Sequence, residues 1–409
     1  MLSPTPVRGR NCIVAPSREA EVGLMTDLRV GIAGLGIASR QVIPAFKQAP
    51  GVTLTAVADV RPEALEEFGS WLGLKTFSSV QAMCESKDVD AVWVATPNPL
   101  HAEHTVTAAN NGKHVICEKP MAVTLDEAQA MVDAVDRNRV KYVQGHSKIF
   151  TPPIRKMVEI AASGELGQVI QVNSWHYRSW LDAPRLASEL DTTKGGGALY
   201  RQGPHQVDIV RGIAGGMVRS VRGTAGQWHP DFYTEGDYTA YLDFENGAVA
   251  TVVLNGYGHF DITELTWGIG EDGVAIEDRP RRPKRSAPLT PEEKYALPAY
   301  RNPRHTAERN RPFQSFLGLT IASCERGDLR QSPKGLYVYT EHGRTEVATG
   351  EDIGHAAELR ELAAAIQEDR PPFPDARWGM ATLEVVLAIL QSGRERREIV
   401  LEHQVERPF

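Results

Sequence analysis

The chain has 409 residues, of which 42% are hydrophobic and 24% are charged, and its formal net charge is −7. A chain of this length buries a substantial core but exceeds what one core usually organises, so two domains are expected. The negative charge argues against nucleic acid or an anionic membrane as partner, so we expect a small-molecule substrate, and any anionic ligand must meet locally placed Arg or Lys.

The chain has four cysteines, which lie far apart in the sequence: Cys12, Cys84, Cys117 and Cys324. Their spacing fits neither a disulfide framework nor a zinc site, so we predict no metal and a cytoplasmic location. No segment approaches the roughly 18 apolar residues that a membrane span requires. Residues 1–24 lack the apolar stretch of a signal peptide and are interpreted as a disordered extension, with Met1 or Met25 as the true start.

From Leu28 to about residue 150, short β-branched runs alternate with longer amphipathic segments. The runs are LRVGIAG, LTAVADV, DAVWVATP, KHVICEKP and VKYVQGH. Continuous apolar strands separated by helices are typical of a parallel sheet covered on both faces, and right-handed crossovers make it doubly wound. We predict a Rossmann dinucleotide-binding domain over residues 25–150, with another α/β fold as the alternative.

A second, α+β domain is predicted over residues 151–409. Thr151-Pro152-Pro153 opens a helix that runs to about Gly164. The runs QVIQVNSWHY, YTAYLDF, AVATVVLNG and TELTWGIG alternate with a period of two, which predicts a mostly antiparallel sheet. Glu245-Asn246-Gly247 is expected to form a hairpin turn. Segment 278–312, rich in Pro and Arg, is interpreted as a surface loop or arm, and two helices, about 355–368 and 376–392, close the chain.

The first predicted strand runs directly into a glycine-rich turn, Gly34-Leu35-Gly36-Ile37-Ala38-Ser39. Such a turn lets main-chain N–H groups approach a pyrophosphate, and Ser39 is small enough to replace the third glycine. Asp59 ends the second strand, where a carboxylate binds the adenosine ribose and repels a 2′-phosphate. NAD is therefore favoured, although Arg61 keeps NADP open. Asp59 as an ordinary turn residue is the alternative.

Three further motifs carry a family resemblance: Ala95-Thr96-Pro97-Asn98 with His101; Glu118-Lys119-Pro120; and Gly195-Gly196-Gly197 followed by His205 and Asp208. Together they resemble the Gfo/Idh/MocA family, the relatives of glucose-fructose oxidoreductase and inositol dehydrogenase. The resemblance implies an open-faced, mostly antiparallel second sheet that packs against another subunit in a homodimer or homotetramer. It also implies that the final helices pack back towards the Rossmann domain.

The resemblance also assigns roles to residues. It implies that Thr96, Pro97, Asn98 and His101 line the nicotinamide side, that Glu118 holds the cofactor ribose, and that Lys119 sits between nicotinamide and substrate. A cation near a developing alkoxide lowers the pKa of the alcohol, which is the role expected for Lys119. A neutral imidazole removes the hydroxyl proton, which is the role expected for His205. The alternatives are a surface lysine and a structural helix histidine.

The chain departs from the family at Arg201, where the usual pattern has an aspartate four positions before the histidine. An arginine there is expected to keep His205 neutral and to offer a fork to a substrate carboxylate. Arg178 is a candidate second guanidinium, with an exposed strand-end residue as the alternative. The candidate walls of the substrate site are Trp175, His176, Tyr177 and Trp180.

Two arginines favour a dianionic, cyclic substrate. The lines YRQGPHQVD and SCERGDLRQSPKGLYVY are similar to those of phthalate cis-4,5-dihydrodiol dehydrogenases, which implies oxidation of a ring cis-diol to a catechol with NAD⁺. Ser323 to Gly327 is interpreted as a hairpin turn rather than a catalytic segment. The alternatives are a sugar, cyclitol or sugar-acid dehydrogenase and a non-catalytic NAD-binding regulatory protein.

Overall fold

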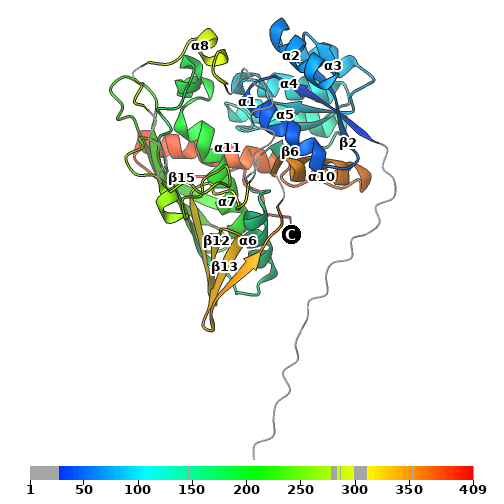
Figure 1. Cartoon of the computed structure of the whole chain (residues 1–409). Helices are drawn as coiled ribbons and strands as arrows, with labels where there is room; N and C mark the ends of the chain where they lie inside the picture. The colour runs from blue at the N-terminus through cyan, green and yellow to red at the C-terminus, as the bar shows by residue number, and fades with distance from the viewer. Residues whose placement is uncertain are drawn as a thin grey trace, which may run out of the picture.

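The computed structural model describes residues 27–145, 148–277, 283–285, 287–298, 311–351 and 354–408. The predicted extension 1–24 and about half of segment 278–312 lie outside these ranges. The described part of that segment, predicted as a loop or arm, contains a short helix at Pro291–Tyr295. Figure 1 shows two units side by side, with the parallel sheet at the upper right and a larger sheet extending down on the left.

The N-terminal unit is a six-stranded parallel sheet in the order β3-β2-β1-β4-β5-β6, which is the doubly wound Rossmann order predicted from the sequence. Its strands are β1 (Leu28–Ala33), β2 (Val52–Ala58), β3 (Lys75–Phe77), β4 (Ala91–Val94), β5 (His114–Glu118) and β6 (Tyr142–Gly145). The intervening helices are α1 (Ile37–Val42), η1 (Ile43–Gln48), α2 (Pro62–Leu72), α3 (Val80–Glu85), η2 (Asn98–Leu100), α4 (His101–Asn110) and α5 (Leu125–Asn138). The three-residue strand β3 was not predicted, because it is too short for a periodic signal.

The C-terminal unit is a nine-stranded sheet in the order β14-β13-β12-β11-β7-β10-β9-β8-β15, antiparallel except where β10 pairs with β7. Its strands are β7 (Val169–Tyr177), β8 (Val218–Gly226), β9 (Asp237–Phe244), β10 (Val249–Asn255), β11 (Leu319–Cys324), β12 (Gly327–Ser332), β13 (Gly335–Thr340), β14 (Gly343–Ala348) and β15 (Ile399–Val400). Its helices are α6 (Pro152–Ser163), η3 (Ala187–Leu190), η4 (Thr192–Lys194), α7 (Gly197–Ala214), η5 (Ile262–Leu265), α8 (Pro291–Tyr295), α10 (Gly354–Gln367) and α11 (Ala376–Glu395). The mostly antiparallel sheet predicted from the sequence is confirmed.

Two hairpins agree with the sequence prediction and one predicted strand is wrong. β9 and β10 are joined through Glu245-Asn246-Gly247, and β11 and β12 through Glu325-Arg326. The run 263–270, predicted as a strand, instead begins within η5. The carboxylate of Asp261 accepts hydrogen bonds from the main-chain N–H of Thr263 (2.9 Å) and from its hydroxyl (2.7 Å), and this local cap favours a turn over a ladder.

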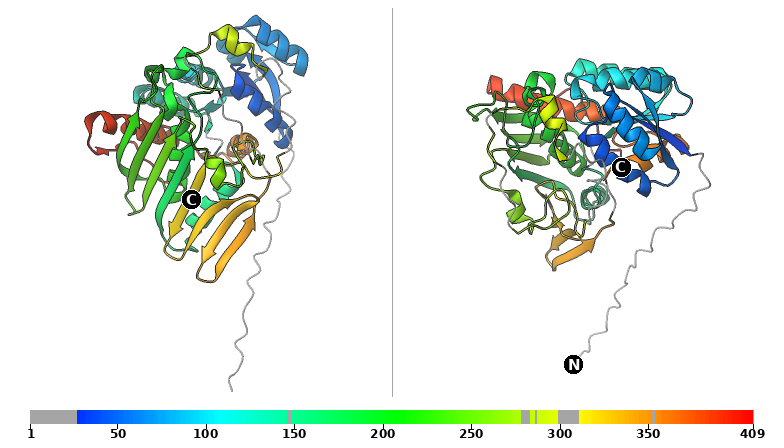
Figure 2. Two further views of the ribbon diagram at one scale, coloured as in Figure 1. Left: turned by 60° about the vertical axis from the view of Figure 1, so that its left-hand side comes forward. Right: turned by 45° about the horizontal axis from the view of Figure 1, so that its top comes forward.

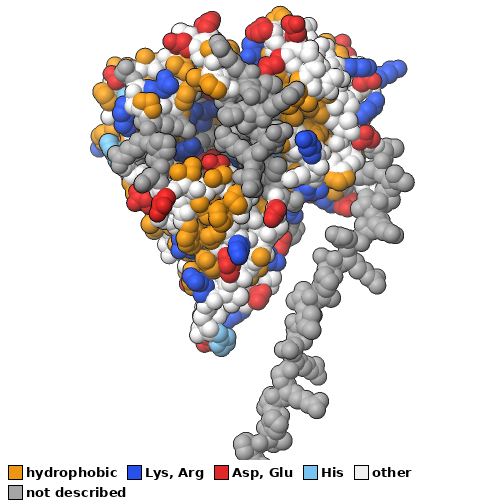
Figure 3. Space-filling view, in the orientation of Figure 1, with side chains coloured by type: hydrophobic (Ala, Val, Ile, Leu, Met, Phe, Trp, Pro, Cys, Tyr) orange, Lys and Arg blue, Asp and Glu red, His pale blue; other side chains and the backbone are white. Residues whose placement is uncertain are grey.

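Helices cover one face of the nine-stranded sheet, and Figure 2 shows the strands as one layer with the helices to one side. Along β9 buried residues alternate with partly or fully exposed ones, as expected for a sheet covered on one side. The other face carries exposed Trp175 and Tyr241. In the orientation of Figure 1, Figure 3 shows hydrophobic side chains gathered over the part of this unit that contains β12 and β13.

The last two helices join the two units. α11 packs against α5 and β6 of the Rossmann unit and also against α7 and β8, and α10 packs against η1 and β6. Arg377 at the start of α11 contacts Asp136 of α5 at 2.6 Å. The helix α6 instead packs against α7, β12 and β13, so we propose the domain boundary between residues 150 and 151. None of the described helices is long and apolar enough to cross a membrane.

Candidate active site

The glycine turn is built so that its backbone approaches a neighbouring loop. Gly34 has φ +90°, and a Cβ added there would lie 2.7 Å from the carbonyl oxygen of Ala95, so only glycine fits. A Cβ on Gly36 would meet no atom within 4 Å, which leaves open space at the start of α1, beside Ile37 and Ala38. Ser39 is fully buried, as expected for the third glycine position. This cradle fits a pyrophosphate.

Asp59 lies at the carboxyl end of β2, beside the glycine turn. Its carboxylate accepts hydrogen bonds from the main-chain N–H of Leu35 (2.7 Å) and from the guanidinium of Arg61 (two at 3.0 Å). Burial raises the pKa of Asp59, but these hydrogen bonds and the charge of Arg61 outweigh burial and leave the pKa below its usual value. Asp59 is therefore ionised, and Arg61 is held at its edge.

The loop after β4 is tied to two other segments. The imidazole of His101, only 1% exposed, contacts the carbonyl oxygens of Thr96 (2.8 Å) and Pro120 (2.7 Å). The amide of Asn98 donates to the carbonyl oxygen of Gly195 at 2.7 Å. His101 thus joins the loop that contains Thr96 and Pro97 to the one after β5, while Asn98 joins the Rossmann unit to the glycine-rich segment before α7.

Glu118 and Lys119 lie at the end of β5. The indole N–H of Trp93 donates to Glu118 at 3.3 Å, and burial raises the pKa of Glu118. The Lys119 Nζ donates to the main-chain carbonyl oxygen of Arg201 at 3.1 Å. Burial lowers the pKa of Lys119 to about 8, and the charge of Arg201 acts in the same direction. This lysine can change its charge near neutral pH.

The helix α7 carries both Arg201 and His205, and it contacts Lys119 through the main-chain carbonyl oxygen of Arg201. Residues four apart lie on the same helix face, and the carbonyl of residue 201 points towards the turn that contains residue 205. His205 is 7% exposed. The guanidinium of Arg201 is 3.3 Å from the carboxylate of Glu189. Glu189 was not predicted from the sequence as a site residue.

Asp208 belongs to a different environment from His205. Its carboxylate accepts a hydrogen bond from the indole N–H of Trp378 on α11, and Thr382 lies 3.5 Å away. The neighbouring Arg211 is fully buried and stacks on the Trp378 ring at 3.9 Å. Asp208 therefore holds α7 to α11.

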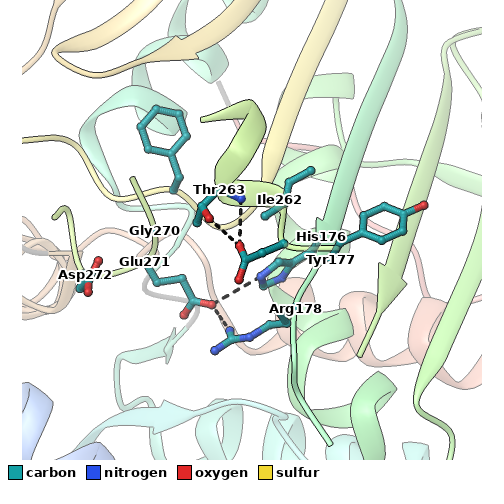
Figure 4. A pocket seen from close by; sticks show the side chains of 10 residues that line it. His176, Tyr177, Arg178, Ile262, Thr263, Gly270, Glu271 and Asp272 are labelled. Atoms are coloured by element: carbon teal, nitrogen blue, oxygen red, sulfur yellow. Dashed lines mark hydrogen bonds and ion pairs between the residues drawn. The ribbon is translucent and has the colours of Figure 1, made fainter. Parts of the chain in front are cut away.

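A cavity of about 210 Å³ adjoins Arg178 at the end of β7 (Figure 4). Arg178 forms an ion pair with Glu271, and Glu271 also lies 3.6 Å from His176 and 3.9 Å from Lys148. Burial raises the pKa of Glu271, but the charges of Arg178, Lys148 and His176 lower it to about 2. Neither Glu271 nor Lys148 was predicted from the sequence.

Two of the four predicted wall residues, His176 and Tyr177, line this cavity. Figure 4 shows the Tyr177 ring pointing away from Arg178 and Glu271, and it meets Phe260 edge to face at 5.5 Å. Trp175 is on the same outer face, because side chains alternate along a strand. Trp180 is fully buried, with the guanidinium of Arg185 over its ring at 3.8 Å. Among the four, His176 brings a ring nitrogen to 3.6 Å from the carboxylate of Glu271.

Basic side chains interact electrostatically around Lys119 and around the neighbouring Lys148. We call the following residues the basic cluster: Lys119, Lys148, Arg178, Arg185 and Arg201. The charges of Arg201 and Arg185 lower the pKa of Lys119, and Arg178 lowers that of Lys148. The carboxylates that act on the cluster include Glu118, Glu189, Glu271 and Asp272. Basic groups outnumber acidic ones, so the site attracts an anion.

The N-terminal unit has a parallel Rossmann sheet with a glycine turn. The C-terminal unit has a mostly antiparallel sheet and the helix α7, which contacts Lys119. Together these features define a two-domain nicotinamide-dependent oxidoreductase. Two family models match the chain: the oxidoreductase family with NAD-binding Rossmann fold over residues 28–146, and the C-terminal domain of the same family over residues 154–273. The chain belongs to the Gfo/Idh/MocA family and binds NAD.

Two similar proteins share most of their length with this chain. A Comamonas testosteroni protein named 1-carboxy-3-chloro-3,4-dihydroxycyclohexa-1,5-diene dehydrogenase is 32% identical over 377 residues, which cover 90% of this chain and 95% of that protein. A protein from Bordetella bronchiseptica RB50, known from its crystal structure, is 34% identical, with a TM-score of 0.82 over 92% of this chain and 100% of that one.

Levoglucosan dehydrogenase, solved in complex with NADH and levoglucosan, is 20% identical with a TM-score of 0.72 over 91% of this chain and 99% of that one. At that identity the likeness shows the fold.

Proposed function

We propose that this oxidoreductase oxidises a cis-diol on a carboxylated ring, such as a phthalate cis-dihydrodiol, to a catechol. The basic cluster is the observation that carries the proposal, because a neutral sugar has no charge to balance it. The Comamonas testosteroni relative, whose name describes a carboxylated dihydroxycyclohexadiene, supports the same substrate class.

The cofactor has a defined place in this proposal. Asp59 receives the adenosine ribose, the turn at Gly34 and Gly36 receives the pyrophosphate, and Glu118 with the Thr96 to Asn98 loop receives the nicotinamide end. When bound, NAD⁺ supplies the acceptor for the hydride that leaves the carbinol carbon.

The chain's own residues handle the proton and the charge. Protonated Lys119 donates a hydrogen bond to the reacting hydroxyl and stabilises the developing alkoxide, and neutral His205 takes the hydroxyl proton. Arg201 binds a ring carboxylate. The resulting ring ketone tautomerises to a catechol, and aromatisation supplies driving force.

Glu271 and Glu189 compensate the arginines when no substrate is present. An uncompensated buried charge is costly, so each carboxylate stabilises its guanidinium until a substrate carboxylate joins it. The dicarboxylate assignment rests on Arg178 as the second binding group beside Arg201.

A substrate panel tests the proposed function. Purified protein is incubated with NAD⁺ and the cis-dihydrodiols of phthalate, benzoate and benzene, together with inositol and glucuronate, and NADH formation is measured. We expect kcat/KM for the carboxylated diols to exceed that for the benzene diol at least about tenfold, which corresponds to about 1.4 kcal/mol. Oxidation of inositol or glucuronate with no activity on the diols would contradict the proposal.

We also propose that the chain forms a homodimer or homotetramer through the outer face of the nine-stranded sheet. The exposed Trp175 and Tyr241 on that face support this assembly. Light scattering on the purified protein measures the mass, and a Trp175→Glu variant is expected to shift it to the monomer. A monomeric wild-type protein would contradict the proposal.

A further inference from the structure

A short helix from the Pro/Arg-rich segment lies across the two units. α8 is defined locally: the Thr290 hydroxyl accepts from the N–H of Glu293 (3.2 Å), and the Glu293 carboxylate accepts from the N–H of Thr290 (2.8 Å). This reciprocal capping fixes the first turn of a helix. In Figure 1, α8 stands at the top of the C-terminal unit, on the side of the Rossmann helices.

One residue of α8 contacts the cofactor side. The Arg61 guanidinium lies over the Tyr295 ring, with 4.4 Å between its central carbon and the ring centre. The edge of the same guanidinium is bound to Asp59, and one of its nitrogens donates to the carbonyl oxygen of Leu35 at 3.0 Å. Tyr295 therefore completes the set of contacts that fixes Arg61 beside the ribose-binding carboxylate.

The preceding residue of α8 contacts the substrate side. Lys294, 5% exposed, forms an ion pair with Glu189, and Glu189 lies 3.3 Å from the guanidinium of Arg201. The same segment is attached further upstream, where the N–H of Leu289 donates to the carbonyl oxygen of Arg185 at 2.7 Å. Adjacent residues of one helical turn thus reach the two ends of the active site.

We propose that α8 is a positioning element that couples the adenosine end of the cofactor site to the substrate site. Tyr295 holds Arg61 so that the Asp59 carboxylate keeps the orientation that receives the ribose. Lys294 holds Glu189 and, through it, Arg201. The part of this proposal that concerns Arg201 and the substrate rests on the proposed function. The part that concerns Arg61 and the cofactor does not.

Coupling through α8 has a thermodynamic consequence. Loss of the Lys294–Glu189 pair releases α8 from the substrate side and so weakens the Tyr295–Arg61 contact, although Lys294 does not touch Arg61. If α8 couples the two sites, thermodynamic linkage requires that a ligand at the cofactor site changes the affinity of the substrate site by a certain factor. A ligand at the substrate site then changes the affinity of the cofactor site by the same factor.

The first experiment measures NADH affinity by fluorescence titration in Tyr295→Ala, Tyr295→Phe and Lys294→Gln. A cation–π contact contributes about 0.5–1 kcal/mol, so we expect a two- to fivefold weaker affinity in Y295A and a wild-type affinity in Y295F, which keeps the ring. We expect K294Q to weaken NADH binding as well, and the double variant Y295A/K294Q to lose no more than Y295A. An unchanged affinity in Y295A or K294Q, or additive losses in the double variant, would overturn the inference.

The second experiment adds phthalate as a substrate-like dianion and measures its affinity with and without NADH. We expect NADH to tighten phthalate binding in wild type and Y295F and to have little effect in Y295A. Equal tightening in Y295A and Y295F overturns the coupling. Absence of phthalate binding in every variant counts against the proposed substrate class, and the NADH titrations then decide the inference about α8.

Discussion

The ammonium group of Lys119 donates a hydrogen bond to the main-chain carbonyl oxygen of Arg201, whose own guanidinium lowers the pKa of that same lysine. The backbone of residue 201 therefore places the lysine, while its side chain adjusts the charge of the lysine. These two effects can be separated, because a substitution at position 201 keeps the carbonyl group.

The pH dependence of turnover follows from this pair. With a pKa of about 8, Lys119 is protonated below that pH and neutral above it, so we expect kcat/KM for alcohol oxidation to fall as the pH rises through about 8. Arg201→Gln removes a positive neighbour, which favours the protonated lysine and moves the alkaline limb to higher pH. A limb that stays at the same pH in R201Q would show that another group titrates.

The number of carboxylates on the substrate can be read from two variants. A charge-assisted hydrogen bond contributes about 1.5–3 kcal/mol, so we expect Arg201→Gln to lower kcat/KM for a carboxylated diol by about ten- to a hundredfold and for benzene cis-dihydrodiol by less than about threefold. Arg178→Gln should penalise the phthalate diol more than the benzoate diol. Equal losses on charged and uncharged diols would rule out carboxylate recognition by these arginines.

Cofactor preference should depend on Asp59 more than on any other single residue. Asp59→Ser removes the ribose-binding carboxylate and releases the Arg61 guanidinium to meet a 2′-phosphate, so we expect weaker NADH binding and stronger NADPH binding in fluorescence titrations. The double variant D59S/R61Q is the control, because it should lose the gain for NADPH. A gain that persists without Arg61 would contradict this account.

The buried network at Asp208 should matter for stability rather than for substrate. Burial lowers the pKa of Arg211 to about 10, while the negative charge of Asp208 acts in the opposite direction. Asp208→Asn leaves Arg211 without that charge and should lower the free energy of unfolding by about 3 kcal/mol. Denaturant unfolding measures the loss, with Asp231→Asn on an exposed loop as the control expected within about 0.5 kcal/mol of wild type. An equal stability of D208N and D231N would contradict this role.

Features set by local pattern were predictable from the sequence. The glycine turn at Gly34 and the carboxylate at the end of β2 follow from a strand that meets a helix, and the β9–β10 hairpin follows from Asn246-Gly247. Each of these depends on residues within a few positions, so chain geometry alone places them.

Features that depend on distant pairing were not predictable. Glu271 meets Arg178 across 93 residues of sequence, and nothing near Glu271 marks it as the partner of a strand-end arginine. Likewise, alternation along β7 shows that Tyr177 and His176 face opposite sides, but not which side holds the site. Glu189 could have been found from its position in the sequence, because it lies just before the glycine-rich segment that leads into α7.

The helices that close the chain also bear on how the protein is made. α10 and α11 come after residue 353, yet they cover β6, η1 and α5, which come from the first 145 residues. Domains generally fold in the order in which they leave the ribosome. Here the last helices complete the cover of the first domain, so we expect β6 to lack that cover until the chain is nearly complete.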